Sequence, residues 1–333
     1  MKNVHIEQLP SGSHFPVVIR SDRPGAKLSE WVGSSKPFID MIVSKQGAIL
    51  FRDFGEQSTE EFQELITSLS DQLVEYKFRS TPRSNVSGRI YTSTEYPADE
   101  WIPMHNEMAY TNAWPMKVWF YCAIAADEGG ETPIADSREV FKAIDPQVRE
   151  EFGRKGVMYA RNYSPALDLP WQEVFQTSER REVEDYCSGN GIRFEWLEGD
   201  RLRTRQVCQG VAKHPKSGEE LWFNQAHLFH VTSLRPEVRE VLMGEFAEED
   251  LPRNTFYGDG TPIPASVLDH IRGVFAECSV LFPWQVGDML MLDNMLIAHG
   301  RAPYGGARKI VVGMAEEVHS KDLQVLPISP GGE

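Results

Sequence analysis

The stretch IPMHNEMAY, residues 102–110, places His105 two positions before Glu107. Alternate side chains of a strand project to the same side, so this pair could bind one metal ion. A third ligand must come from elsewhere, and His299 in DNMLIAHGRAPYGGARK (293–309) is the candidate. A site made from residues so far apart requires an early and a late strand to lie side by side. The pattern therefore predicts a barrel rather than two independent domains.

The ligand set has a defined chemistry. Two imidazoles and one carboxylate on one face of an octahedron leave three positions open, which suits non-haem Fe(II) that activates oxygen. The pair alone is weak evidence, because nine histidines and 49 acidic residues among 333 give roughly one His-x-acid pair by chance. A lone His-x-Glu most often marks a strand end with a solvated charge. The metal interpretation therefore depends on the residues that accompany the pair.

Two further residues favour a dicarboxylate ligand. Arg308 lies nine residues after His299, at the head of the apolar run 310–314. A guanidinium presents paired donors in one plane, which matches a carboxylate in a bidentate way. Thr132, in GGETPIAD, offers a hydroxyl that could bind the same group.

Four stretches, in this order and spacing, resemble the TauD/TfdA-like (taurine dioxygenase-like) family of Fe(II)/2-oxoglutarate-dependent dioxygenases over nearly the whole chain. They are YTSTEYPADEWIPMHNE (91–107), GGETPIADSREVF (129–141), LWFNQAHLFH (221–230) and GDMLMLDNMLIAHGRAPYGGARK (287–309). The resemblance implies that His105, Glu107 and His299 are catalytic iron ligands. It also implies that Arg308 and Thr132 bind the C5 carboxylate of the co-substrate 2-oxoglutarate. Oxidative decarboxylation of 2-oxoglutarate by O2, to succinate and carbon dioxide, would drive hydroxylation of a C–H bond of the substrate.

The resemblance also bears on the substrate. Glu107, where taurine dioxygenase has Asp, is similar to clavaminate synthase and to the syringomycin-type amino-acid hydroxylase branch. This implies hydroxylation of an amino acid, or of an amino-acid-derived substrate tethered to an acyl or peptidyl carrier protein, in specialised metabolism. Halogenation is disfavoured, because related halogenases replace this carboxylate with a small residue.

Three alternatives remain open. The same iron chemistry could act on a sulfonate or an aryloxy acid. It could also desaturate or cyclise an amino acid instead of hydroxylating it, because the triad does not distinguish these outcomes. A metal-free jelly-roll binding protein is the third alternative, and it would be marked by loss of a ligand or of the arginine, whereas this chain has them all.

The expected fold is mainly β with α insertions, built on a double-stranded β-helix, or jelly-roll, core. The site joins positions 105 and 299, so we expect one oxygenase domain over residues 1–333, with a mainly helical insertion at about 137–278. The tail 323–333 is expected to be loose. Expected strands are 15–20, 48–51, 90–94, 117–123, 289–292 and 310–314, and residues 58–73 have the apolar spacing of a helix.

Composition narrows the partners and the location. A net charge of −15 argues against nucleic-acid binding, because little excess Lys and Arg is available to neutralise phosphates. Four cysteines without a C-x-x-C pair indicate reduced thiols, and neither a signal peptide nor a membrane span is recognisable, so a cytoplasmic protein is expected. A homo-oligomer is left open. Two basic stretches are interpreted as solvated faces, or else as a lid or an attraction for an acidic carrier protein: Lys77, Arg79, Arg83 and Arg89, and Arg201, Arg203 and Arg205.

Other polar residues have less specific roles. Asn224 could order the site or contact the substrate. Arg301 could face the pocket or pair with a surface acid. His227 and His230 are expected to pack or form hydrogen bonds, since the triad is complete without them, and Trp222 and Trp284 are expected in the core.

Overall fold

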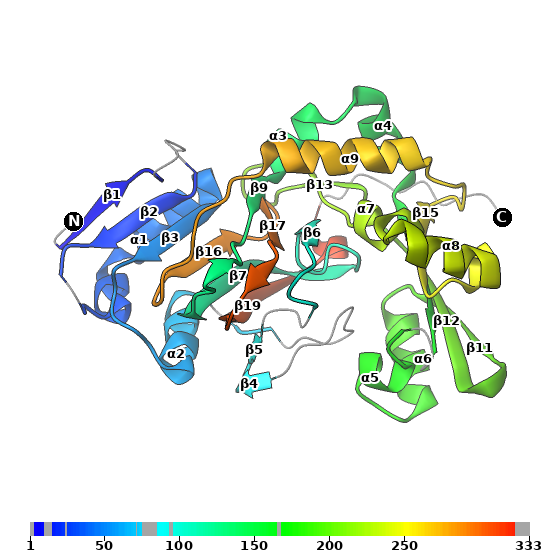
Figure 1. The fold of residues 1–333 in the computed structure, drawn as a ribbon, viewed down its shortest axis with the longest axis horizontal. Coiled ribbons are helices and arrows are strands. Elements are labelled where there is room, and N and C mark those ends of the chain that lie inside the picture. The colour runs from blue at the N-terminus through cyan, green and yellow to red at the C-terminus, as the bar shows by residue number, and fades with distance from the viewer. Residues whose placement is uncertain are drawn as a thin grey trace.

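The computed structural model describes residues 3–9, 15–23, 25–70, 72–74, 85–92, 96–164 and 168–323. Its largest described sheet occupies the left and centre of Figure 1 and is antiparallel except for the parallel β2–β3 pair. Its eight strands, in spatial order, are β1 (Val4–Glu7), β2 (Val17–Ser21), β3 (Ala48–Arg52), β16 (Met289–Asp293), β7 (Ala113–Ile124), β19 (Lys309–His319), β5 (Ile90–Thr92) and β4 (Asn85–Ser87).

A smaller antiparallel sheet contains β6 (Ile102–His105), β17 (Ile297–Arg301) and β9 (Ile134–Asp136), in that order. A two-stranded ribbon, β8 (Glu128–Gly129) with β18 (Tyr304–Gly305), extends from it. A core cluster joins residues of this sheet to one face of the large sheet. The architecture agrees with the predicted jelly-roll core.

Alternation along β16 shows how the large sheet is buried on both faces. Leu290 and Leu292 belong to the core between the two sheets, whereas Met289 and Met291 belong to a second core under two helices. Successive side chains of a strand point to opposite faces, so a strand covered on both sides is apolar throughout.

The two helices on the outer face are α1 (Leu28–Gln46) and α2 (Thr59–Leu69). The sequence predicts α2, which a capping box begins: Ser58 Oγ accepts from the Glu61 amide at 3.2 Å, and the Glu61 carboxylate accepts from the Ser58 amide at 2.9 Å. The helix ends at Leu69, four residues before the predicted end. We did not predict α1, which contains Pro37, a residue that normally interrupts a helix.

Segment 137–278 contains both helices and strands. Its helices are α3 (Ser137–Ala143), α4 (Pro146–Lys155), α5 (Trp171–Phe175), α6 (Arg180–Gly189), α7 (Ala226–Phe229), α8 (Pro236–Glu245) and α9 (Ala265–Cys278). A four-stranded antiparallel sheet packs with them, on the side of the molecule away from β1 and β2 (Figure 1): β11 (Arg193–Leu197), β12 (Arg201–Cys208), β10 (Val157–Tyr163) and β15 (Arg253–Tyr257). A hairpin follows β12, formed by β13 (Val211–Lys213) and β14 (Glu220–Trp222).

The prediction of a mainly helical insertion omitted this sheet. In β12, Arg201, Arg203 and Arg205 alternate with the buried Leu202 and Thr204. This period of two is typical of a half-buried strand, whereas the sequence analysis considers the arginines only as a basic surface patch.

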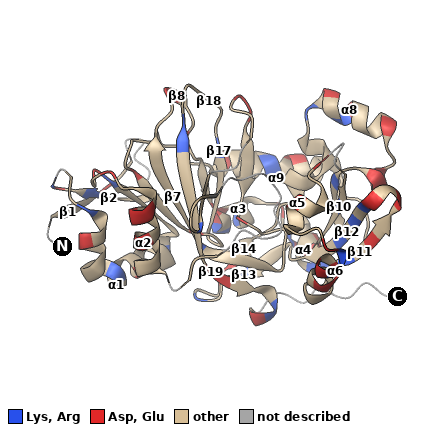
Figure 2. Cartoon of the chain, turned by 90° about the horizontal axis from the view of Figure 1, so that it is seen from below, with Lys and Arg blue, Asp and Glu red and all other residues tan. Residues whose placement is uncertain are grey.

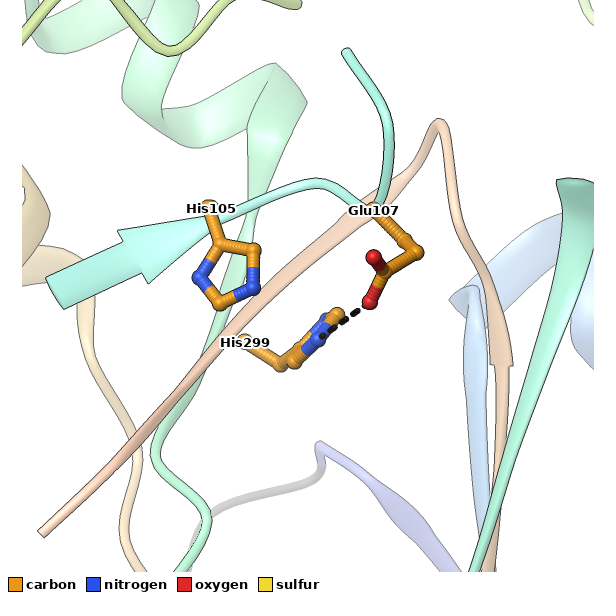
Figure 3. Close-up of side chains that lie close together, drawn as sticks. All are labelled: His105, Glu107 and His299. Atoms are coloured by element: carbon orange, nitrogen blue, oxygen red, sulfur yellow. Dashed lines mark ion pairs between the residues drawn. The ribbon is translucent and has the colours of Figure 1, made fainter. Parts of the chain in front are cut away.

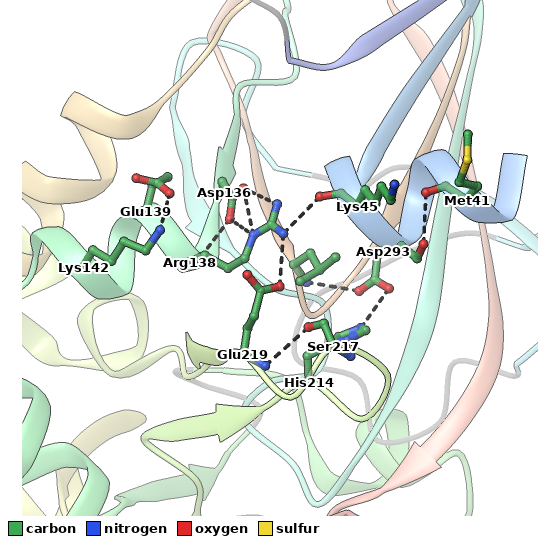
Figure 4. A network of polar contacts seen from close by, with 12 residues as sticks. Met41, Lys45, Asp136, Arg138, Glu139, Lys142, His214, Ser217, Glu219 and Asp293 are labelled. Atoms are coloured by element: carbon green, nitrogen blue, oxygen red, sulfur yellow. Dashed lines mark hydrogen bonds and ion pairs between the residues drawn. The ribbon is translucent and has the colours of Figure 1, made fainter. Parts of the chain in front are cut away.

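A polar network joins the β13–β14 hairpin to the barrel (Figure 4). Arg138, in the first turn of α3, donates to the backbone oxygen of Lys45 at 3.0 Å and to Glu219 at 3.2 Å. His214 of the β13–β14 connection lies 3.1 Å, Nε2 to Oδ2, from Asp293 at the end of β16, and both side chains are buried. These contacts anchor the hairpin next to β16, the strand that precedes His299.

None of the helices in the described ranges is long and apolar enough to cross a membrane. All four cysteines are free, as predicted, and Cys122, Cys187 and Cys208 are buried. The expected loose tail and the basic residues Lys77, Arg79 and Arg83 lie outside the described residues, apart from Leu323 at the start of the tail.

Candidate active site

The three predicted metal ligands converge because two of them face each other in the small sheet. His105 ends β6 and pairs directly with His299 of β17, and their ring centroids are 4.5 Å apart. Glu107 lies two residues beyond β6, and its Oε2 is 3.9 Å from Nε2 of His299. One potential ligand atom from each residue lies within 4.8 Å of the other two. Figure 3 shows the three side chains pointing toward one another.

The surroundings of the histidines orient their rings. Nδ1 of His105 lies 2.8 Å from the carbonyl of Pro103. Because a carbonyl only accepts, Nδ1 carries the proton, and Nε2 presents its lone pair to a metal. Phe120 of β7 packs edge-on against His299, with centroids 5.0 Å apart. Glu107 and His299 are 3% and 4% exposed, so these two side chains are shielded from bulk water, whereas His105 is partly exposed.

Asn294 holds the backbone of Glu107, a role that the sequence analysis missed. Its Oδ1 accepts from the Glu107 amide at 2.7 Å, and its Nδ2 donates to the Glu107 carbonyl at 2.9 Å. Nδ2 also donates to the carbonyl of Pro115 at 2.9 Å, and the side chain is fully buried. The residue lies in a quoted motif, but nothing in its local pattern indicates a partner 187 positions away.

Arg308 and Thr132 line one pocket with His105 and His299. Arg308 donates through Nε to the carbonyl of Gly130 at 2.9 Å and forms no ion pair within the described ranges. Burial, and then the neighbouring Arg301, lower the pKa of Arg308 to about 10, so the guanidinium stays protonated at neutral pH. A cation in a partly apolar pocket without an acid partner is suited to an anionic ligand.

Two glycines allow the pocket to form. Gly130 has a φ of +73°, and a Cβ there would lie 3.0 Å from Cδ of Arg308. A Cβ at Gly300 would lie 2.7 Å from the carbonyl oxygen of Ile102, in the neighbouring strand β6. Larger residues would displace the arginine in the first case and separate the ligand-bearing strands in the second.

The second arginine of the pocket has a structural role. Arg301 is 5% exposed, and its guanidinium donates to the carbonyls of Tyr96 at 3.0 Å, of Pro97 at 2.5 Å and of Glu100 at 3.0 Å. Of the two roles considered, Arg301 faces the pocket, which it lines, and among the described residues it pairs with no surface acid. Its hydrogen bonds instead hold the segment that leads into β6 and His105.

Asn224 and His227 are both anchored to backbone groups. The Asn224 amide donates to the carbonyl of Gly210 at 2.7 Å and accepts from the amide of Ala226 at 3.0 Å, which favours an ordering role over substrate contact. Nε2 of His227 lies 2.9 Å from the carbonyl of Met104, and burial lowers the pKa of this histidine to about 3, so it is neutral and donates. The expected hydrogen-bonding role of His227 is confirmed.

The donor set fits an iron(II) site. Two imidazoles and one carboxylate converge from one side, and the pocket with Thr132 and Arg308 adjoins them. In the described part of the chain, no acceptor exists for the Thr132 proton and no acid for Arg308, so both donors are available to a carboxylate. The residues present therefore suit a metal together with a dicarboxylate.

Comparisons with known proteins agree with this geometry. Residues 7–315 match the family described as "Taurine catabolism dioxygenase TauD, TfdA family". The chain is 42% identical to the dapdiamide synthesis protein DdaC of Enterobacter agglomerans, over 95% of both chains. It is 28% identical to a clavaminate synthase-like protein of Arabidopsis thaliana, over 94% of this chain and 96% of that one. The crystal structure of the PvcB protein from Pseudomonas aeruginosa has the same fold, with a TM-score of 0.57 at 14% identity, covering 98% of this chain and 95% of that chain. The chain belongs to the TauD, TfdA family of dioxygenases.

Proposed function

We propose that this protein is an Fe(II)- and 2-oxoglutarate-dependent oxygenase that hydroxylates an unactivated C–H bond of an amino acid or amino-acid-derived substrate in specialised metabolism. The family supports the reaction class. The relative DdaC is named for the synthesis of dapdiamide, and PvcB is described as an Fe, alpha-ketoglutarate dependent oxygenase from an isonitrile synthetic pathway. The observation that carries the proposal is the convergence of the triad next to a pocket that His105 and His299 line together with Arg308, which has no acid partner in the described part of the chain.

In this proposal, His105, Glu107 and His299 bind iron(II). The hydrogen bond from His105 Nδ1 to Pro103 fixes the tautomer that leaves Nε2 available. The Glu107 carboxylate supplies one negative charge, and Asn294 fixes the backbone from which it projects. Ligands held in this way keep their geometry when the other coordination positions change occupants.

Arg308 and Thr132 bind the distal carboxylate of 2-oxoglutarate. The Arg308 guanidinium provides charge and paired donors, while the Thr132 hydroxyl, which is 2% exposed, provides one further donor. Holding the far end of the co-substrate places its keto acid end toward the triad. Because the co-substrate is held in place, its reaction at the triad becomes effectively unimolecular.

The iron, when bound with 2-oxoglutarate and O2, supplies the oxidising power for the C–H bond. The chain contributes orientation and exclusion of water. The apolar part of the pocket lining includes Phe120, Ile310 and Val312. Ile310 is 2% exposed and Val312 is 1% exposed. A dry, rigid wall favours transfer of oxygen to the positioned carbon over side reactions with water.

The proposal includes delivery of the substrate by an acyl or peptidyl carrier protein. Arg193 and Arg205 are exposed and lie directly opposite each other on β11 and β12. Like charges directly opposite each other destabilise a strand pair. Neither arginine forms an ion pair within the described ranges, so an acidic carrier protein bound here would reduce the repulsion between them. Figure 2 shows Lys and Arg ribbon along β12, with Asp and Glu ribbon next to it. A homo-oligomer and a cytoplasmic location stay predictions.

Two alternatives share the iron chemistry. The pocket geometry does not separate a sulfonate or aryloxy acid from an amino acid, nor hydroxylation from desaturation or cyclisation. A metal-free binding protein is disfavoured because the triad, Thr132 and Arg308 are all in place.

The test is O2-dependent release of succinate from 2-oxoglutarate by the iron-loaded protein, with free amino acids and with carrier-loaded aminoacyl groups as substrates. His299→Ala is the control. The proposal expects one substrate class to stimulate release in the wild type, and none in the variant. Equal rates in both proteins would contradict the role of His299. Preference for a sulfonate or an aryloxy acid would keep the iron chemistry and replace the substrate class.

A further inference from the structure

Trp284 donates the hydrogen bond that fixes the orientation of the Thr132 hydroxyl. Its Nε1 lies 3.1 Å from Thr132 Oγ1, and the two residues are 8% and 2% exposed. An indole nitrogen only donates, so Thr132 accepts here and must direct its own proton elsewhere. In the described part of the chain no group accepts that proton, and the pocket shared with Arg308 lies beside it.

The turn that carries Trp284 is held on both sides by a buried ion pair. Arg52 of β3 binds Asp288 through two hydrogen bonds, at 2.6 and 3.0 Å, with side chains 4% and 1% exposed. Arg52 also donates to the carbonyl of Pro283 at 2.9 Å, while the Asp288 carboxylate accepts from the amide of Gln285 at 2.9 Å. The residues before and after Trp284 are therefore fixed to the same pair.

The backbone that carries Thr132 is tied to the same segment. Ile134 and Val280 exchange two backbone hydrogen bonds, from the Ile134 amide at 3.0 Å and from the Val280 amide at 2.8 Å. Both partners of the Trp284–Thr132 bond thus project from positions with little freedom. The bond is a fixed feature of the pocket wall rather than a chance contact of two mobile side chains.

We infer that Trp284 is a positioning residue for the co-substrate: its indole N–H holds the Thr132 hydroxyl so that the hydroxyl proton points at the distal carboxylate of 2-oxoglutarate. This rests on the proposed function, which places that carboxylate at Arg308 and Thr132. Without the indole donor, the hydroxyl can rotate and offer a lone pair, which repels a carboxylate. Trp284 therefore acts through Thr132 on binding of the co-substrate and has no contact with the reacting carbon.

Trp284→Phe tests the inference because it removes the N–H and keeps an aromatic ring. We expect 2-oxoglutarate to bind about threefold to tenfold more weakly, as for loss of one neutral hydrogen bond. The readout is the dissociation constant, measured by calorimetry with Mn(II) in place of iron, so that it does not depend on turnover. Binding of 2-oxopentanoate, which has the same chain length without the distal carboxylate, should not change.

Trp222→Phe is the matched control. Trp222 is fully buried, and within the described ranges its Nε1 has no hydrogen-bond partner, so this variant loses the same indole volume without losing a hydrogen bond. It should leave 2-oxoglutarate binding unchanged. An equal loss of affinity in both variants would contradict the inference and indicate a general effect of repacking.

A double-mutant cycle with Thr132→Val separates the possible failures. We expect Thr132→Val to weaken 2-oxoglutarate binding by about tenfold to a hundredfold, as for a hydrogen bond to a charged group. In that background Trp284→Phe should have no further effect. Additive losses would overturn the positioning role while leaving the carboxylate site in place. No loss in Thr132→Val would instead contradict the proposed placement of the co-substrate, and the inference with it.

Discussion

Two arginines of the same barrel differ in whether an acidic side chain pairs with them, and this difference distinguishes a structural arginine from one suited to bind a ligand. Arg52, at the end of β3, is buried with Asp288, and its Nε and Nη2 donate to that acid and to a carbonyl. Arg308 lines the pocket next to the triad and, within the described ranges, has no acid partner. A buried pair stabilises a fold only as a pair, whereas an unpaired cation in a pocket costs stability until a ligand supplies the anion. The contrast predicts opposite consequences for the same substitution at the two positions.

Arg52→Met should have the largest effect on stability. It leaves the buried Asp288 carboxylate without its partner, which costs about 3–5 kcal/mol of the free energy of unfolding. Urea denaturation measures this loss. The matched control is Arg154→Met in the exposed Arg154–Glu151 pair of α4, where the loss should stay below about 1 kcal/mol. Similar losses in the two variants would break the distinction between buried and exposed pairs.

Arg308→Met should have the opposite effects, with weaker co-substrate binding and no loss of stability. Binding of 2-oxoglutarate should weaken about a hundredfold, as expected when a charge-assisted bidentate contact worth about 3 kcal/mol is removed. The free energy of unfolding should be unchanged or higher, because a cation without an acid partner has been removed. The KM for 2-oxoglutarate and urea denaturation report the two effects. A destabilised variant with an unchanged KM would make Arg308 structural, like Arg52.

Asn294→Ala extends the comparison to two buried asparagines, of which only Asn294 holds the backbone of a predicted metal ligand. Without the amide, the Glu107 backbone loses both hydrogen bonds to this side chain, so iron affinity should fall at least tenfold. Asn224→Ala is the control, since Asn224 is equally buried and its side chain makes two hydrogen bonds to backbone groups, against three for Asn294. Both variants should be less stable, but only Asn294→Ala should lose iron in a competition with a chelator. Equal iron affinities would remove Asn294 from the site.

His230 should give the smallest effect, which depends on pH. Burial lowers the pKa of His230 to about 4, below the ordinary value of 6.5 that it has in the unfolded chain. As the pH falls below 6.5, the unfolded chain takes up a proton that the folded protein does not, so stability declines until the pH nears 4. His230→Gln should reduce this decline by at most about 1 kcal/mol per pH unit. Urea denaturation at pH 7 and pH 5 measures it, and equal slopes for both proteins would contradict the shifted pKa.

Local patterns predicted what depends on local geometry. The apolar runs around Leu290 and Val311 indicated strands, which the structure contains as β16 and β19. His105 and Glu107 do converge, but not by the expected alternation within one strand, because β6 ends at His105 and Glu107 lies in the turn that follows. The pocket also brings Arg308 and Thr132 together as the resemblance implied. Their roles as ligands of iron and 2-oxoglutarate stay predictions.

What the sequence analysis missed depends on distant contacts or on competing signals. Asn294 reaches Glu107, and Trp284 reaches Thr132, across separations of 187 and 152 positions that no local pattern encodes. Pro37 obscured α1, where tertiary packing outweighs local propensity. The alternation in β12 is itself a local signal for a strand, which the sequence analysis did not use.

The most direct test of the account is to measure, without oxygen, how iron(II) and then 2-oxoglutarate bind to the wild type, His299→Ala and Arg308→Met. We predict that His299→Ala loses iron and with it the co-substrate. Arg308→Met should keep iron at wild-type affinity but bind 2-oxoglutarate no better than 2-oxopentanoate. Retention of iron by His299→Ala, or a preserved preference for 2-oxoglutarate in Arg308→Met, would contradict the assignment of this pocket.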